Sequence, residues 1–219
     1  MEFIESFMKF SFADDDVFRI EEDELAGGNS GHKACECVVL ISPRIAFIEA
    51  KASTPNPNSS ERFNKFIDDI KQKFKDSLNL FEGIKKGHLG EEALMRLPVN
   101  LRNAEVPTND YLIYLIVHGH RLDWLSGLQD ALREALRDVV KEWNLRDSNV
   151  KALNEEIAKE LHLITGYVPR NIVDNLRQDN GNADELSGIL QGRTSSWSSM
   201  ASTPATIFSA SRSRLIITG

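Results

Sequence analysis

The sequence predicts an α/β fold with a mixed central sheet flanked by helices and a helical C-terminal extension. Two strand-like segments, residues 33–41 and 44–52, flank a Ser-Pro turn signal, which predicts a β-hairpin. Apolar residues then recur at helical spacing over residues 59–82. Residues 111–117 are continuously apolar between turn residues, which is typical of a strand buried on both faces.

The length and composition of the chain allow one sizeable core with appendages. The chain has 219 residues, of which 41% are hydrophobic, and a formal net charge of −7. This acidic balance counts against tight nonspecific binding of nucleic acid, although a local basic face can coexist with it. We expect an α/β core at residues 1–120 and a helical part packed on it at 121–190. Residues 191–219 are a Ser/Thr-rich tail with too few apolar residues for ordered packing.

Shorter elements are expected around the hairpin and the helix. Near-alternation of apolar and polar residues predicts one strand over residues 3–12, and residues 17–20 are a second strand candidate. Asn58 and Glu61 have the spacing of an N-terminal cap for the helix that follows. Residues 87–109 have no clear period, and we expect a connection with one short helix there.

The carboxyl-terminal half is predicted to be helical. Apolar residues at helical spacing predict one long amphipathic helix over residues 122–143 and a second over residues 150–161. A shorter helix is expected over residues 170–176, with Pro169 in its first turn.

The two cysteines, Cys35 and Cys37, are two apart in an apolar run, so strand geometry points both to one face. We expect small buried strand residues here, because no further ligands are arranged nearby for a zinc site. Reduced cysteines, a start unlike a signal segment and the lack of a long apolar run predict a cytoplasmic protein with no membrane partner.

Glu36, Glu49 and Lys51 are the candidate catalytic residues. Glu49 and Lys51 are two apart on a predicted strand, so both side chains emerge on the same face. If residues 42–43 form the turn, Glu36 lies opposite Glu49; if the turn shifts by one residue, Glu36 lies opposite Lys51. Either register gathers the three charges on one patch, whereas a loop of odd length separates them.

Acidic side chains on an otherwise apolar hairpin need compensation, because opposed like charges repel and ionised groups resist burial. A divalent cation offsets both costs. Two carboxylates with a backbone carbonyl and waters suit Mg²⁺, for which Mn²⁺ is a substitute. The expected ligands are Glu36, Glu49 and the carbonyl of Ala50. Lys51 is expected to contact the attacking water or the phosphate.

This arrangement resembles the PD-(D/E)xK nuclease superfamily. An acid on one strand, a tight turn and an acid-x-Lys on the paired strand look like its core, and residues 47–53 (Phe-Ile-Glu-Ala-Lys-Ala-Ser) are similar to its (D/E)xK strand. In that superfamily a helix and another strand follow the hairpin, as residues 59–82 and 111–117 do here. The resemblance covers residues 1–120 in topology and the hairpin alone in motif. It implies a restriction-endonuclease-like core and a metal-dependent nuclease acting on DNA.

The match departs from the pattern of the superfamily at its acidic positions. The first acid there is usually Asp, often after Pro, and here it is Glu36 after Cys35. A Glu on an early helix often lies near the site, and Glu21 or Glu22 is the candidate for that metal ligand, although their acidic run also fits a solvated turn. By the same resemblance, Gln72 is expected to line the cleft.

Two further groups of residues are candidates for contact with nucleic acid. Lys65 and Lys73 are eight apart, close to one helical face, and predict a phosphate-contacting ridge, although interleaved Asp residues fit a solvated face equally well. Trp124 and Trp143 are expected to be packing anchors rather than base-stacking platforms.

Two alternatives to a nuclease stay open. One is a catalytically inactive nuclease-like fold that acts as a nucleic-acid or protein interaction module, which the low basicity and the Glu-for-Asp change favour. The other is an unrelated α/β scaffold in which Glu49 and Lys51 form a salt bridge. In each case the acidic helices of the carboxyl-terminal part are expected to offer a docking surface for a protein partner or a second copy.

Overall fold

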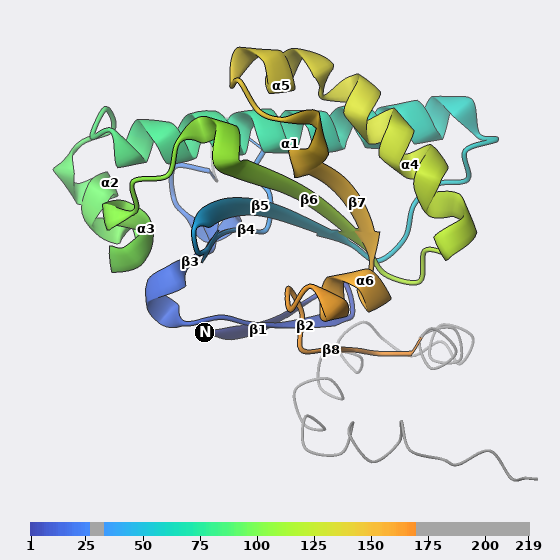
Figure 1. The fold of residues 1–219 in the computed structure, drawn as a ribbon, viewed down its shortest axis with the longest axis horizontal. Coiled ribbons are helices and arrows are strands. Elements are labelled where there is room, and N and C mark those ends of the chain that lie inside the picture. Colours follow the sequence, from blue (N-terminus) through green and yellow to red (C-terminus); the bar gives the residue numbers. More distant parts are fainter. Residues whose placement is uncertain (27–32, 170–219) are drawn as a thin grey trace, which may run out of the picture. The chain divides into compact units, whose positions relative to one another are not determined.

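A mixed five-stranded sheet forms the centre of the fold (Figure 1). The computed structural model describes residues 1–26 and 33–169. In spatial order the strands are β3 (Val17–Phe18), β4 (Cys37–Ile41), β5 (Arg44–Lys51), β6 (Tyr111–Val117) and β7 (Val150–Asn154). β3, β4 and β5 pair antiparallel, whereas β5, β6 and β7 pair parallel. The predicted α/β class with a mixed central sheet is therefore confirmed.

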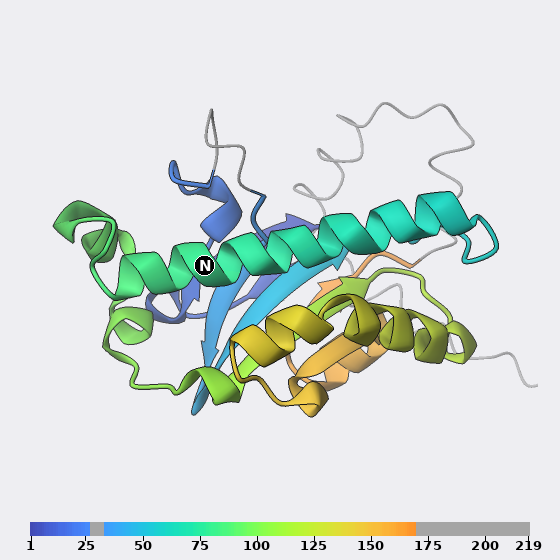
Figure 2. The same cartoon turned by 90° about the horizontal axis from the view of Figure 1, so that it is seen from above.

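One face of this sheet is covered by helices. α1 (Ser60–Lys85) lies over the sheet, and α4 (Leu122–Ala135) and α5 (Arg137–Glu142) run beside α1 on the same face (Figures 1 and 2). An ion pair of 2.8 Å between Lys71 Nζ and Asp138 Oδ2 joins α1 to α5. α1, α4 and α5 therefore form one helical layer.

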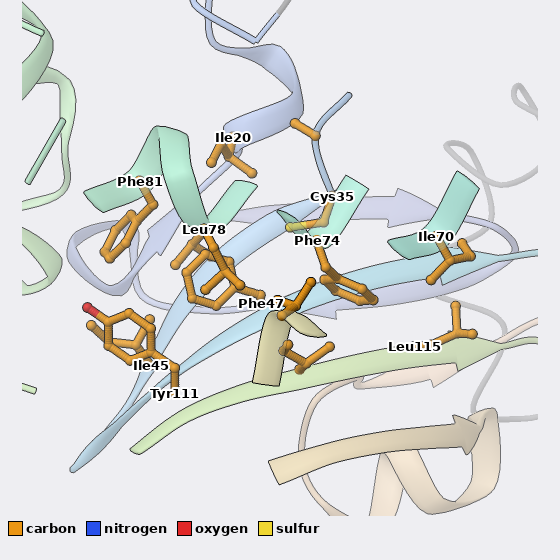
Figure 3. Close-up of a cluster of buried hydrophobic side chains, with 14 of the residues drawn as sticks. Ile20, Cys35, Ile45, Phe47, Ile70, Phe74, Leu78, Phe81, Tyr111 and Leu115 are labelled. Carbon is orange, nitrogen blue, oxygen red and sulfur yellow. The ribbon is translucent and has the colours of Figure 1, made fainter. Parts of the chain in front are cut away.

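The core between the sheet and α1 is rich in aromatic side chains (Figure 3). The ring of Phe47, on β5, lies 5.5 Å from that of Phe81, on α1, and 5.6 Å from that of Tyr111, on β6. Phe47 and Phe81 meet edge-on, at 89°, which is a favoured arrangement of aromatic rings. Phe74 and Leu78, one turn apart on α1, are fully buried in the same cluster. This packing holds α1 at a fixed position over β5.

The opposite face of the central sheet packs against a small antiparallel sheet and a short helix. The strands of the small sheet, in spatial order, are β1 (Glu2–Glu5), β2 (Met8–Ser11) and β8 (Gly166–Tyr167), and the helix is α6 (Glu155–Glu160). Met8 and Phe10 are fully buried in the core on this face, with Ala46 and Ile48 of β5. The central sheet is thus covered on both sides, as the continuous apolar run of β6 predicts.

The amino-terminal segment differs from the predicted single strand over residues 3–12. It forms a hairpin in which β1 and β2 are joined by Ser6 and Phe7. Both turn residues have positive φ, 50° and 65°, the conformation that matches the twist of a two-residue hairpin. Neither residue is a glycine or an asparagine, so the sequence carries no usual signal for this turn.

The segments around α1 also differ in detail. α1 begins at Ser60 and its N-cap residue, Ser59, makes no side-chain cap bond, so the cap expected from Asn58 and Glu61 is wrong. The region after α1 holds two short helices rather than one, α2 (Glu91–Arg96) and α3 (Val99–Asn103). Short 3-10 helices occur at Asp14–Asp16, Ile20–Glu22, Thr108–Asp110 and Asp147–Asn149.

The expected helix over residues 150–161 is wrong. Its first part is β7, which pairs with β6 along the edge of the central sheet, and only its second part, from Glu155, is helical. The sheet therefore extends beyond residue 120, and the described portion of 121–190 is not wholly helical. The single helix expected over residues 122–143 is divided at Leu136, where the backbone (φ −88°, ψ 4°) separates α4 from α5.

The two cysteines are free and buried, but they do not face the same side. Cys35 packs in the core beneath α1, whereas Cys37 packs in the core against the small sheet. The prediction of a common face is wrong because Cys35 precedes β4 and is separated from it by a bend at Glu36. The backbone N–H of Cys35 donates to Ser77 Oγ on α1 at 2.8 Å, which fixes the chain as it enters β4.

The helix expected over residues 170–176 and the tail at 191–219 lie outside the described residues. Within residues 1–26 and 33–169, no helix is both long enough and apolar enough to cross a membrane.

Candidate active site

Alternation along β5 places Glu49 and Lys51 on the face that α1 covers. Ile45 and Phe47 belong to the core beneath α1, and the intervening Ala46 belongs to the core on the other face. Because side chains of a strand alternate between faces, Glu49 and Lys51 continue the row of Ile45 and Phe47. The two charged side chains lie at the carboxyl end of β5, where the aromatic core ends.

The register of the hairpin brings Glu36 to the same place. Cys37 pairs with Ile48, and the pairing runs to Ile41 with Arg44 around a two-residue turn. Continuing this register by one residue sets Glu36 opposite Glu49, which is the first of the two registers that the sequence allowed. Glu36 itself lies at the bend before β4 rather than within the strand. The three candidate catalytic residues are therefore gathered, as predicted.

Lys73 of α1 is the cation at the centre of the carboxylates. Its Nζ lies 3.0 Å from Glu49 Oε1, 3.3 Å from Glu21 Oε1 and 3.9 Å from Glu36 Oε1. Lys51 Nζ contacts the same Glu49 oxygen at 2.5 Å. The site thus contains three carboxyl groups and two ammonium groups. Glu21, carried by the 3-10 helix at Ile20–Glu22, joins it through Lys73, whereas Glu22 pairs with Arg19.

The two hairpin carboxyl groups are deeply buried and incompletely paired. The side chain of Glu49 is 0% exposed and that of Glu36 is 4% exposed. Glu36 Oε2 has no hydrogen-bond partner among residues 1–26 and 33–169. Glu49 Oε1 lies within ion-pair distance of both lysines but accepts no hydrogen bond of ordinary geometry. Buried polar atoms of folded proteins are nearly always satisfied, so the unpartnered Oε2 of Glu36 marks a place where a further polar or charged group fits.

The protonation of the site follows from this burial. Burial, the hydrogen bond with Glu21 and the charge of Glu49 together raise the pKa of Glu36 to about 9. Burial also raises the pKa of Glu49, although Lys73 and Lys51 oppose the change. Burial raises the pKa of Glu21 as well, but its hydrogen bond with Glu36 and the charge of Lys73 outweigh it, so the net shift is downward. Near neutral pH, Glu36 therefore carries a proton beside an ionised Glu21.

Lys73 stays charged under these conditions. Burial alone would lower the pKa of its ammonium group, but the surrounding carboxylates, led by Glu49, outweigh burial and raise this pKa. A permanently charged ammonium beside buried acids compensates part of their desolvation.

The carbonyl of Ala50, expected as a metal ligand, is contacted by the turn between β1 and β2. Ser6 Oγ lies 3.2 Å from this carbonyl oxygen and 3.0 Å from Glu5 Oε1. A carbonyl oxygen has two lone pairs, and Ser6 occupies one of those of Ala50. The negative charge of Glu5 also contributes to the raised pKa of Glu36, so this hairpin tip belongs to the surroundings of the site.

The expected nucleic-acid ridge on α1 is not present as a ridge. Lys65 is exposed, whereas the side chain of Lys73 is only 17% exposed and turns toward the carboxylates. Gln72 does not line the site: its Nε2 donates to Asp76 Oδ1 at 2.6 Å on the exposed side of α1. Ile70 and Ser77, three residues before Lys73 and four after it, are buried, so Lys73 lies on the inward side of α1.

In the part of the chain that the structure describes, no group of three or more His, Cys, Asp or Glu side chains is arranged to hold a metal ion. The ammonium of Lys73 lies within ion-pair distance of Glu21 and of both hairpin acids. The donor set that remains is Glu36 and Glu49, with the Ala50 carbonyl. Mg²⁺ is commonly held by one or two carboxylates and several waters, so this set suits it without a third acidic side chain.

The comparisons made with protein-family models, with curated proteins and with solved structures found no match for this chain.

Proposed function

We propose that the chain is a metal-dependent nuclease with a restriction-endonuclease-like core, which hydrolyses phosphodiester bonds, most readily those of DNA. The observation that carries the proposal is the convergence of Glu36, Glu49 and Lys51 on one face of the hairpin. The unpartnered Oε2 of the buried Glu36 supports it. Hairpin, long helix and parallel strand also follow one another in the order that the resemblance implies.

Mg²⁺ or Mn²⁺ is the cofactor in this proposal, held by Glu36, Glu49 and the Ala50 carbonyl. A bound divalent cation lowers the pKa of a water and stabilises charge on the phosphate. Glu36 must lose its proton to serve as a ligand, so its raised pKa makes metal affinity depend on pH.

Lys51 is the residue that contacts the substrate in this proposal. Its side chain is the more exposed of the two lysines, 31% against 17% for Lys73, and it stands at the end of β5 where a phosphate can approach. Its ammonium neutralises charge that develops on the phosphate and orients the attacking water. Lys73, deeper in the site, holds the carboxylates in place.

A cleavage assay with a matched lysine control tests the proposal. Wild-type protein, Lys51→Ala and Lys71→Ala are incubated with plasmid, linear and single-stranded DNA and with RNA, in Mg²⁺, Mn²⁺ or EDTA. Lys71 is the control because it pairs with Asp138, away from the carboxylates. We expect metal-dependent cleavage by wild type and Lys71→Ala, and a rate lower by about 100-fold or more in Lys51→Ala. Equal cleavage by wild type and Lys51→Ala would count against the site.

The second candidate function is a catalytically inactive nuclease-like fold that acts as a nucleic-acid or protein interaction module. The position of Lys73 favours it, because an ammonium among the acids supplies without metal part of the compensation that a cation would give. The same assay separates the two candidates. Metal-dependent cleavage supports the nuclease, and its absence in every preparation, with folding intact, supports the interaction module.

A further inference from the structure

Trp124 is exposed on the first turn of α4, contrary to the expectation that it packs in the core. Its exposed fraction is 55%, and it is the one aromatic side chain of residues 1–26 and 33–169 that ranks as exposed. Its neighbour Leu122 is 58% exposed, so this turn presents apolar surface to solvent. Trp143, the other tryptophan expected to pack, does lie against the core.

The ring of Trp124 is held in place by its neighbours although it is exposed. His120 approaches it edge-on, with ring centroids 6.2 Å apart and planes at 72°. The guanidinium of Arg121 lies over the ring, 5.2 Å from its centroid, and also pairs with Asp123 at 3.1 Å. His120 Nδ1 lies 3.2 Å from Thr54 Oγ1, in the segment that follows β5. A ring fixed in this way loses little conformational freedom when another ring stacks on it.

The turn that carries Trp124 adjoins the candidate active site. Lys51 and Val117 are register partners at the carboxyl ends of β5 and β6. The backbone N–H of His118, the next residue, donates to the carbonyl of Lys51 at 2.8 Å. The chain then leads through His120 to Trp124. The exposed ring therefore lies at the same end of the sheet as Lys51, beyond the carboxyl ends of β5 and β6.

The charge of the chain decides which nucleic acid suits this ring. A net charge of −7 disfavours binding that depends on neutralising the phosphates of a duplex. Stacking of an unpaired base on an aromatic ring depends on the ring rather than on net charge, and a neighbouring Arg adds a cation for the base or its phosphate. Within a duplex, each base pair is stacked on both faces and offers none to an exposed side chain.

We propose that Trp124, with Arg121, is a stacking platform for an unpaired base beside the active site. The substrate class of the nuclease is then nucleic acid with single-stranded nucleotides, such as a single-stranded end, flap or loop. The choice of nucleic acid as the ligand rests on the proposed function.

Binding measured without hydrolysis tests this platform. The full chain is titrated in EDTA against fluorescently labelled oligothymidine and against a duplex of equal length, and binding is followed by fluorescence polarisation. The variants are Trp124→Ala, Trp124→Phe and the control Leu122→Ala, which removes equally exposed apolar surface from the same turn. We expect Trp124→Ala to weaken single-strand binding by about 5- to 100-fold. Trp124→Phe and Leu122→Ala should stay close to wild type, and duplex binding should be weaker throughout.

Three results would overturn the platform: single-strand binding that Trp124→Ala leaves unchanged, an equal loss in Leu122→Ala, or a duplex that binds as tightly as the single strand. A change of oligomeric state in Trp124→Ala without a change in oligonucleotide binding would assign this surface to a second copy instead. Failure of the platform is distinguishable from failure of the nuclease. Cleavage without dependence on Trp124 overturns only the platform, whereas single-strand binding through Trp124 without any cleavage overturns only the catalytic proposal.

Discussion

The ammonium group of Lys73, on α1, lies 3.0 Å from the carboxylate of Glu49, on β5. This ion pair joins the helix layer to the hairpin at the point where the aromatic core ends. The same ammonium is shared with Glu21 and Glu36, so one cation serves three carboxyl groups. A divalent cation bound to the hairpin acids would therefore compete with Lys73 for the same negative charge.

Lys73→Met is expected to destabilise the metal-free protein, because it leaves buried carboxyl groups without their central cation. Removing one partner of a buried pair costs about 3–5 kcal/mol, and the lower end applies here because Lys73 keeps some exposure. Mn²⁺ should restore part of the loss by replacing the missing charge. Urea denaturation in EDTA and in Mn²⁺ measures both effects. The control is Lys65→Met on the exposed side of α1, with an expected change within about 0.5 kcal/mol. A loss that Mn²⁺ leaves untouched would contradict the competition.

Glu36→Gln is expected to change how stability depends on pH. Because its pKa is raised from 4.5 to about 9, folded protein holds a proton there that unfolded protein releases between these values. The contribution of Glu36 to the free energy of unfolding therefore falls as pH rises through this window, by at most about 1.4 kcal/mol per pH unit. Glutamine does not titrate, so the free energy of unfolding of Glu36→Gln should rise relative to that of wild type as pH rises. The pKa of Glu21 is lowered from 4.5, so its effect on the free energy of unfolding falls at pH values below this range.

The measurement for Glu36→Gln is the free energy of unfolding in EDTA across this pH range, beside the exposed control Glu61→Gln. We expect the curves of Glu36→Gln and wild type to separate steadily with rising pH, and the control to follow wild type. Parallel curves for all three proteins would show that Glu36 holds no proton in the folded protein across this pH range.

Asn154→Ala is expected to weaken the junction between β7 and α6. Its side-chain Oδ1 accepts a hydrogen bond from the Ile157 N–H at 3.0 Å and caps α6, and its Nδ2 donates to the His120 carbonyl at 3.3 Å. Loss of an N-cap of this kind costs about 0.5–2 kcal/mol, and the buried position of Asn154 favours the upper end. Urea denaturation beside Asn100→Ala, whose side chain is exposed, tests this. Equal losses of the free energy of unfolding in both variants would mean that Asn154 stabilises the protein no more than the exposed Asn100 does.

The sequence was sufficient for the part of the fold and site that local rules determine. A two-residue turn and strand alternation bring Glu36, Glu49 and Lys51 together, because the period of a strand leaves few choices once the turn is known. The apolar stripe of α1 and the uninterrupted apolar run of β6 also predicted their elements correctly, because each pattern is long.

The sequence was not sufficient where tertiary pairing overrides local preference. β7 contains Ala152 and Leu153, which suit a helix, and its strand conformation comes from pairing with β6. Asn154 followed by two glutamates is a helix-start signal that would have divided the segment correctly. The central position of Lys73 depends on how α1 is rotated over β5, which the aromatic core decides. Without that rotation, the alternating lysines Lys71, Lys73 and Lys75 predict only a solvated surface.

The most direct measurement is a crystal structure of the protein soaked in Mn²⁺, with anomalous scattering recorded for wild type and Glu49→Gln. We predict a peak between the carboxyl groups of Glu36 and Glu49 in wild type, with the ammonium of Lys73 moved away from Glu49, and no peak in the variant. A wild-type map without a peak there, in which Lys73 still contacts Glu49, would contradict a divalent-cation site on this hairpin.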